Sequence, residues 1–285
     1  MQTLIKLLGL DLDGTLLDSN KQISAVTLRL LRAACNAGVI IVPVTGRPEQ
    51  GIPAVVRGIP GIHYMITTNG AVTRNTDTDE ILNASYISES SVHEIVDILG
   101  DRGNLMEVFT DGAGYVAKEN YEALLNAYAG TALESYMKQS RRSVDNIFSF
   151  TAGAGKIEDI AVDFKSAVPE DMIARLALLP DIQIINSRSS YIEITDGNAT
   201  KGKALLRLAG ALGIDARNSM ACGDDISDIS MIQAAGVGVA MANAREEVKR
   251  AACFTTYSND EDGVAHAVDK FILGGSPCRA FQTIS

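Results

Sequence analysis

The chain has 285 residues, which suits one large domain or two smaller ones. Hydrophobic residues make up 46% of it and charged residues 21%, so a soluble globular fold with a substantial core is expected. The formal net charge of −10 repels nucleic acid and anionic membrane surfaces, and we expect neither as a partner. Asp11 and Asp13 interrupt the apolar N-terminal stretch, so we expect no signal peptide and no membrane span, and a cytoplasmic location.

Residues 1–82 alternate between predicted strands and predicted helices. Ser24 is suited to cap a helix that Gly38 would end, and Pro48 suits the first turn of another. Short apolar and β-branched runs predict strands over residues 4–10, 39–44 and 63–67. This alternation is typical of a doubly wound parallel sheet.

Residues 83–194 follow a different pattern, in which strands pair through turns. A hairpin signal lies at residues 110–112. Strands are predicted over residues 104–109, 114–116, 159–164, 182–187 and 191–195, and helices over 91–99, 119–128 and 169–179. Hairpins combined with helices indicate an antiparallel sheet covered on one face. We therefore expect an inserted α+β domain here.

Residues 195–285 return to the alternating pattern. Thr200 is suited to cap a helix that stops at Gly213. Strands are predicted over residues 219–222, 237–241 and 254–256, and further helices over 226–235, 245–252 and 264–271. Together with residues 1–82, this part is predicted to form a Rossmann-like α/β core.

Two carboxylates, Asp11 and Asp13, follow the first predicted strand at the edge where open α/β sheets bind ligands. A turn at Gly14 would let both side chains approach one ion. Neighbouring carboxylates repel unless a cation neutralises them, and Mg²⁺ prefers hard oxygen ligands. The alternative is an ordinary strand end, because Asp and Gly are common in turns.

Three further segments carry polar groups at strand ends or helix starts. Thr45 and Gly46 precede a predicted helix, where a hydroxyl and free N–H groups can hold a phosphate or can simply cap the helix. Lys201 opens a helix against the macrodipole, so it either points at an anion or is a solvated lysine whose position is accidental. Residues 223–228 contain Asp224, Asp225 and Asp228, which can bind a metal or cap the next helix.

These motifs, in this order, resemble the haloacid dehalogenase superfamily of hydrolases. The segments are DLDGT at residues 11–15, TGR at 45–47, KG at 201–202 and GDDISD at 223–228. The TNGA, EI, ANA and DGVA segments at residues 68–71, 193–194, 242–244 and 262–265 fit too, and are similar to the Cof-type branch. That branch carries a type IIB cap domain, which the resemblance assigns to residues 83–194, with residues 1–82 and 195–285 as the core.

The resemblance implies a role for each matching residue. Asp11 would be the nucleophile that forms an aspartyl-phosphate, and Asp13 the general acid and base. Asp13 should hold its proton better than Asp11, because the metal would contact Asp11 directly. Thr45, Gly46, Lys201 and Ser227 would bind phosphate or substrate. Mg²⁺ would be bound by Asp11, Asp13 (through its backbone carbonyl) and Asp224, with Asp228 supporting the site.

The fourth motif departs from the family pattern at two positions. Asp225 and Ser227 stand where the family commonly has Asn. Ser227 is shorter and lacks amide donors, and Asp225 adds negative charge beside an anion site unless it points away. We expect the metal ligands to be unaffected.

The sequence therefore predicts a Mg²⁺-dependent phosphatase of small phosphorylated metabolites, with sugar phosphates the favoured class. A phosphomutase-like transfer to an acceptor other than water, and a non-catalytic phosphometabolite sensor, are the alternatives. No feature of the sequence predicts an oligomeric state.

Overall fold

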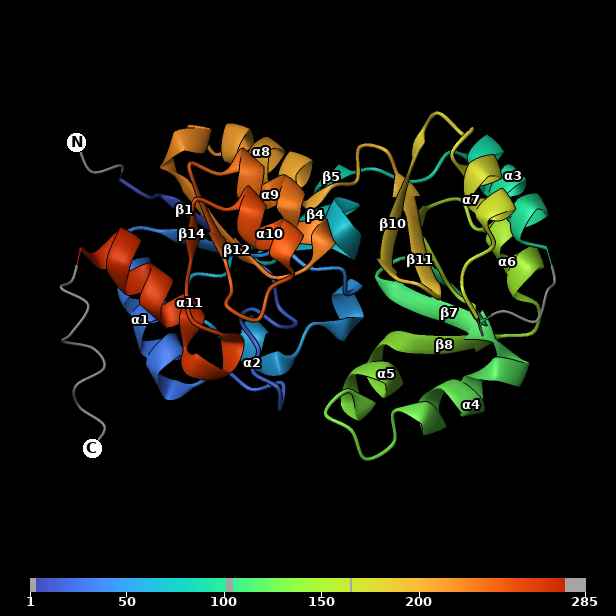
Figure 1. Cartoon of the computed structure of the whole chain (residues 1–285), viewed down its shortest axis with the longest axis horizontal. Coiled ribbons are helices and arrows are strands. Elements are labelled where there is room, and N and C mark those ends of the chain that lie inside the picture. Colours follow the sequence, from blue (N-terminus) through green and yellow to red (C-terminus); the bar gives the residue numbers. More distant parts are fainter. Residues whose placement is uncertain (1–3, 101–104, 165, 275–285) are drawn as a thin grey trace.

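The computed structural model describes residues 4–100, 105–164 and 166–274 of the chain. Its helices and strands form two lobes side by side, each built on its own large sheet (Figure 1). A doubly wound α/β core with an added α+β part was predicted, and this architecture is confirmed. Among the described residues, no helix combines the length and the apolar character that crossing a bilayer would require.

The first lobe contains a five-stranded sheet in the order β14-β13-β12-β1-β2, in which every neighbouring pair is parallel. Its strands are β1 (Leu7–Leu10), β2 (Ile40–Pro43), β12 (Ser219–Gly223), β13 (Val237–Ala240) and β14 (Phe254–Thr255). The central strand β1 pairs with β2 on one side and with the distant β12 on the other. The carboxyl ends of strands from both ends of the chain therefore meet at one edge.

Helices cover both faces of this sheet. On one face, α1 (Ala25–Asn36) and α11 (Gly263–Val268) pack over Leu8 and Leu10, and on the other, α8 (Lys201–Ala211) and α9 (Ile229–Ala234) pack over Leu7. The remaining helices of this lobe are α2 (Ala54–Arg57) and α10 (Glu246–Ala251). The predicted caps are confirmed, since the Ser24 and Thr200 side chains accept hydrogen bonds from the first turns of α1 and α8.

A small antiparallel sheet extends this lobe beyond β2. It consists of β3 (Tyr64–Thr67), β4 (Val72–Asn75) and β5 (Ile81–Ala84), and β3 meets the main sheet through one parallel bridge between Val44 and Ile66. Strands β4 and β5 were not predicted, because they are short, partly exposed and rich in polar residues. The helix expected from Pro48 is only a 3₁₀ turn followed by the four-residue α2.

The second lobe contains a six-stranded sheet in the order β10-β11-β9-β6-β7-β8. It is antiparallel as predicted, except that β7 and β8 are parallel. Its strands are β6 (Leu105–Thr110), β7 (Ala113–Ala117), β8 (Arg141–Val144), β9 (Ile157–Asp163), β10 (Ile182–Arg188) and β11 (Tyr191–Asp196). The predicted hairpin turn is confirmed, with positive φ at Asp111 (48°) and Gly112 (72°). Residue 104, where the first of these strands was expected to start, lies outside the described residues.

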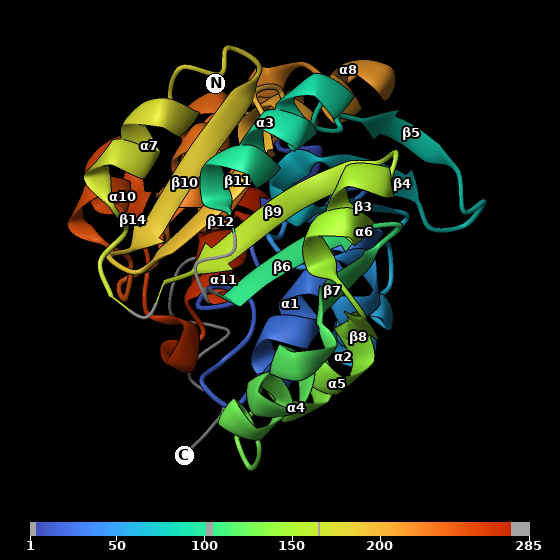
Figure 2. The same cartoon turned by 90° about the vertical axis from the view of Figure 1, so that its right-hand side faces the viewer.

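Helices lie mainly on the outer face of this sheet. Figure 2 shows α3 (Glu89–Leu99), α6 (Ile147–Gly153) and α7 (Glu170–Leu176) in front of the strands, on the side away from the first lobe. The helices α4 (Lys118–Ala127) and α5 (Glu134–Ser140) lie near β7 and β8. The inner face of the sheet therefore faces the first lobe. The sequence did not predict α5, α6 or β8, which are short and lack a sustained apolar period.

The predicted domain boundaries at residues 82/83 and 194/195 remain a prediction. They fall inside β5 and β11, close to the two places where the chain passes between the lobes. We refer below to the first lobe as the core and to the second as the cap.

Candidate active site

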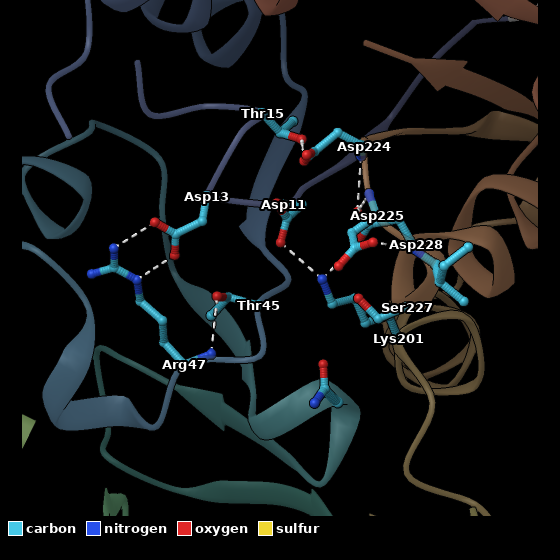
Figure 3. Close-up of polar contacts among 12 residues, drawn as sticks. Asp11, Asp13, Thr15, Thr45, Arg47, Lys201, Asp224, Asp225, Ser227 and Asp228 are labelled. Atoms are coloured by element: carbon cyan, nitrogen blue, oxygen red, sulfur yellow. Dashed lines mark hydrogen bonds and ion pairs between the residues drawn. The ribbon is translucent and has the colours of Figure 1, made fainter. Parts of the chain in front are cut away.

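A cavity of about 330 Å³ lies between the core and the cap, at the carboxyl edge of the parallel sheet. Most of the site residues expected from the sequence line it, namely Asp11, Asp13, Thr45, Gly46, Lys201, Ser227 and Asp228. Asp224 lies beside Asp11 and Asp228 (Figure 3). The structure therefore brings together residues that are far apart in the chain.

The sheet topology explains this convergence. Asp11 directly follows β1, Thr45 follows β2, and Asp224 follows β12, while Lys201 is the first residue of α8. Parallel strands end at the same edge, so side chains that follow them become neighbours. Asp228 enters from the short 3₁₀ turn (Ile226–Asp228) that connects β12 to α9.

Gly14 allows the first and fourth motifs to pack closely. It has a positive φ of 86°, and a Cβ atom at this position would lie 2.3 Å from Oδ2 of Asp224. The neighbouring Thr15 donates a hydrogen bond from its hydroxyl to Oδ1 of Asp224 at 2.7 Å. The Gly-Thr pair of the first motif thus fixes the position of the Asp224 carboxylate.

Lys201 is buried between two carboxylates. Its Nζ lies 2.8 Å from Oδ1 of Asp11 and 2.6 Å from Oδ1 of Asp228, and the side chain is only 3% exposed. Burial alone would lower its pKa, but the two carboxylates raise it, so the ammonium stays charged. Gly202 permits this approach of α8, since a Cβ there would lie 2.2 Å from the backbone oxygen of Ser230.

Asp11, Asp224 and Asp228 form a group of carboxylates whose oxygen atoms lie within 4.8 Å of one another. Burial, followed by repulsion from Asp228, raises the pKa of Asp11 well above its usual range and that of Asp224 to about 7. One lysine therefore does not neutralise the group. A divalent cation with a preference for oxygen ligands fits these residues, because it would relieve the remaining repulsion.

Asp228 differs from the other two members of this group. Its Oδ1 binds Lys201, and its Oδ2 accepts hydrogen bonds at 2.9 Å from the backbone N–H groups of both Asp224 and Asp225. Its carboxylate is thus already used to hold the loop after β12. Asp11 and Asp224 retain more capacity to bind a cation directly.

The Asp13 carboxylate points away from this group (Figure 3). Arg47 donates two hydrogen bonds to it, from Nε at 2.5 Å and from Nη2 at 2.7 Å. Nζ of Lys21 lies 2.8 Å from Oδ1 of Asp13. Burial would raise the pKa of Asp13, but Arg47 and then Lys21 lower it to about 2. Without a metal ion, the pKa of Asp11 is therefore raised and that of Asp13 lowered, and the expectation that Asp13 holds its proton better once Asp11 contacts a metal stays a prediction. The sequence did not reveal the ion pair with Arg47.

The remaining predicted residues form the wall beside Lys201. The buried hydroxyl of Thr45 accepts a hydrogen bond at 3.1 Å from the backbone N–H of Arg47, and Gly46 lines the cavity. Ser227 lies near Lys201 at the cavity surface. Asp225 caps the following 3₁₀ turn and forms an ion pair with Arg245 at 3.2 Å, which offsets its extra negative charge.

The cap contributes a second set of residues that the sequence did not identify as site residues. Glu107 and Glu193 lie in one row across the inner face of the sheet, with Asp163 and Tyr191 in the next row. All four line the cavity, together with Phe109, Tyr136 and Arg141. Burial raises the pKa of Glu193 to about 7. Tyr191 follows the turn between β10 and β11, whereas none of the residues 111–115 at the turn between β6 and β7 lines the cavity.

Comparisons with known proteins agree with this geometry. A family model for haloacid dehalogenase-like hydrolases matches residues 8–268. The phosphatase YwpJ of Bacillus subtilis strain 168 is 30% identical over 281 residues, which cover 92% of this chain and 98% of YwpJ. The 5-amino-6-(5-phospho-D-ribitylamino)uracil phosphatase YwtE of the same strain is 27% identical, with 95% of this chain and 99% of YwtE covered.

A solved structure shares the whole architecture. It is a sugar phosphatase of haloacid dehalogenase subclass IIB, with a TM-score of 0.78 and 26% sequence identity. The match covers 93% of this chain and 98% of that chain, so it includes both the core and the cap.

Replacing Lys201 by Met should destabilise the protein strongly. The substitution keeps the length of the side chain but leaves the buried carboxylates of Asp11 and Asp228 without their cation. We expect the free energy of unfolding to fall by about 3–5 kcal/mol, measured by urea denaturation with a metal chelator present.

The matched control is Lys203→Met, because Lys203 lies on the same helix and is exposed. Its effect should stay below about 0.5 kcal/mol. Equal losses from the two substitutions would contradict the role assigned to the buried ion pairs.

Proposed function

This chain belongs to the haloacid dehalogenase-like hydrolases and is a phosphatase, and we propose that it hydrolyses phosphate monoesters of small metabolites with Mg²⁺ through an aspartyl-phosphate. The observation that carries the proposal is the arrangement around Asp11. This carboxylate opens onto the cavity, Lys201 lies 2.8 Å from it, and Asp224 lies within the same acidic group. A carboxylate nucleophile needs this kind of neutralisation before an anionic substrate can approach.

In the proposed reaction, an Asp11 oxygen attacks the phosphorus atom while the bond to the leaving-group oxygen breaks. Asp13 gives a proton to that oxygen, and later takes one from the water that hydrolyses the aspartyl-phosphate. Lys201 offsets negative charge on the transferring group. Thr45, Gly46 and Ser227 would hold the phosphate oxygens, because they line the cavity beside Lys201.

Mg²⁺, held by Asp11 and Asp224 with the backbone carbonyl of Asp13, would supply the Lewis acid that neutralises the phosphate. Asp228 would support this site through Lys201 and the loop after β12. The ion pair with Arg47 stabilises the ionised form of Asp13, which is the form that takes a proton from water in the second step. A phosphate dianion near Arg47 and Lys21 would share these cations and so raise the pKa of Asp13 toward the range of a proton donor.

Sugar phosphates are the proposed substrate class, on the evidence of the cap. Glu107, Asp163 and Glu193 offer acceptors for hydroxyl groups, and the aromatic side chains of Phe109 and Tyr191 line the cavity beside them. Among the described cap residues that line the cavity, Arg141 is the only cation, and it forms an ion pair with Glu107. The substrate is therefore expected to carry no second anionic group.

Replacing Asp11 by Asn should abolish turnover, because an amide cannot act as the nucleophile. We expect the rate of phosphate release from p-nitrophenyl phosphate to fall about a thousandfold or more, with the far-UV circular dichroism spectrum unchanged. Asp97→Asn, on the exposed side of cap helix α3, is the matched control and should retain full activity. If the Asp11 variant kept wild-type activity, the nucleophile assignment would be wrong.

The stability of the protein should depend on pH through Asp224. Its pKa is about 7 in the folded chain and near 3.8 when unfolded, so the folded state binds more protons between these values. Without divalent metal, the free energy of unfolding contributed by Asp224 should therefore fall as the pH rises from about 4 to 7. Mg²⁺ competes with that proton, so its stabilising effect should be larger at about pH 8 than at about pH 5.

Thermal unfolding at the two pH values, with and without Mg²⁺, measures this effect. Asp224→Asn should remove most of the Mg²⁺ response at both. A response to Mg²⁺ that persists in this variant would place the cation elsewhere.

The charge of the cap predicts a preference among sugar phosphates. We expect kcat/KM for glucose 6-phosphate to exceed that for 6-phosphogluconate by roughly tenfold, because the carboxylate of 6-phosphogluconate would meet Asp163 and Glu193. Equal values would argue against recognition by these carboxylates. Adding a sugar acceptor to the same assay separates hydrolysis from phosphomutase-like transfer, in which phosphate appears on the acceptor.

A further inference from the structure

One aromatic ring of the cap links two arginines from different lobes. The guanidinium carbon of Arg47, in the core, lies 4.3 Å from the centroid of the Tyr136 ring, and that of Arg141, in the cap, lies 5.0 Å from it. Arg141 also donates a hydrogen bond from Nη1 to the Tyr136 hydroxyl at 3.0 Å. Tyr136 therefore connects the two lobes at the cavity, which it also lines.

Arg47 is held on three sides. Two of its nitrogen atoms bind the Asp13 carboxylate, and its Nη1 donates to the backbone oxygen of Gly51 at 2.9 Å. The core supplies these polar contacts, whereas the cap supplies the aromatic face. Because the Arg47 side chain is only 5% exposed, little water competes with any of these contacts.

Tyr136 is itself fixed in place. Its ring packs so closely on the core turn after Pro48 that a Cβ atom on Gly51 would lie 2.4 Å from Cε2. On the cap side, Arg141 holds the hydroxyl and is anchored in turn to Glu107 by an ion pair of 2.5 Å. Arg141 and Glu107 are both buried. A continuous set of contacts thus runs from Asp13 in the core to β6 in the cap.

We propose that Tyr136 is a positioning residue for the reaction, which orients the Asp13 carboxyl by holding Arg47 from the cap side. The proposal rests on the proposed function, in which Asp13 transfers protons. Without the Tyr136 ring, the Arg47 guanidinium loses the contact that fixes its orientation. The Asp13 carboxyl, which Arg47 binds, is then no longer held in one orientation toward the leaving-group oxygen. Asp13 is then well placed only while the cap lies over the core.

The test compares two substrates that differ in their need for a proton donor. The leaving group of 2,4-dinitrophenyl phosphate is stable as an anion, whereas β-glycerol phosphate needs a proton on its departing oxygen. For Tyr136→Ala, kcat/KM for β-glycerol phosphate should fall about tenfold, and kcat/KM for 2,4-dinitrophenyl phosphate should change less than about twofold. Tyr136→Phe keeps the ring and should restore both values to within about twofold of the wild type.

Tyr121→Ala is the matched control, because Tyr121 belongs to the same hydrophobic cluster of the cap but does not line the cavity. It should leave both kcat/KM values unchanged. If Tyr136→Ala does not fold, Tyr136→Leu carries the same test, since Leu fills the space without offering an aromatic face. Equal losses on both substrates, or no loss on either, would overturn the proposal. If the wild type hydrolyses neither substrate, the proposed function itself fails.

Discussion

The site depends on the burial of Lys201 between Asp11 and Asp228. Three carboxylates crowd the carboxyl edge of the sheet, and their mutual repulsion opposes the pairing of β1 with β12 that brings them there. Lys201 offsets part of this repulsion from the start of α8. The helix can come close enough only because Gly202 leaves room for the backbone at Ser230. The electrostatic balance of the site therefore depends on the close packing of α8.

Features that depend on local sequence could be predicted. Ser24 and Thr200 were identified as helix caps because capping involves only the next three residues. Residues at strand ends, such as Asp11 and Thr45, were grouped because parallel strands share an edge. Strands β4 and β5 were missed since each has only four residues, and neither contains an apolar run longer than two. Periodicity detects burial, whereas these strands are held in their sheet by pairing, β4 with β3 and β5 with β4.

Contacts between residues far apart in the chain could not be predicted from local patterns. The ion pair of Asp13 with Arg47 depends on the direction of a side chain after a turn, and Tyr136 reaches Arg47 only because the cap sheet lies over the core. Likewise, Glu107 and Glu193 share a row only through the register of β6, β9 and β11. Nothing in the spacing of these residues indicates that they face one cavity. The chemistry of the phosphate could therefore be predicted, whereas the surroundings of the leaving group could not.

The environments of Asp11 and Asp13 have the most consequence for mechanism. The two residues are separated by one position, yet Asp11 faces carboxylates and Asp13 faces cations, so burial and Asp228 raise one pKa while Arg47 lowers the other. Such differences assign acid and base roles, and without a metal ion the order of the two pKa values is the reverse of the one that a nucleophile and an acid require. A cation between Asp11 and Asp224 would lower the pKa of both. An anion beside Arg47 would raise that of Asp13. On this argument, the cation and the substrate together set the order in which the two carboxyl groups hold their protons during the reaction.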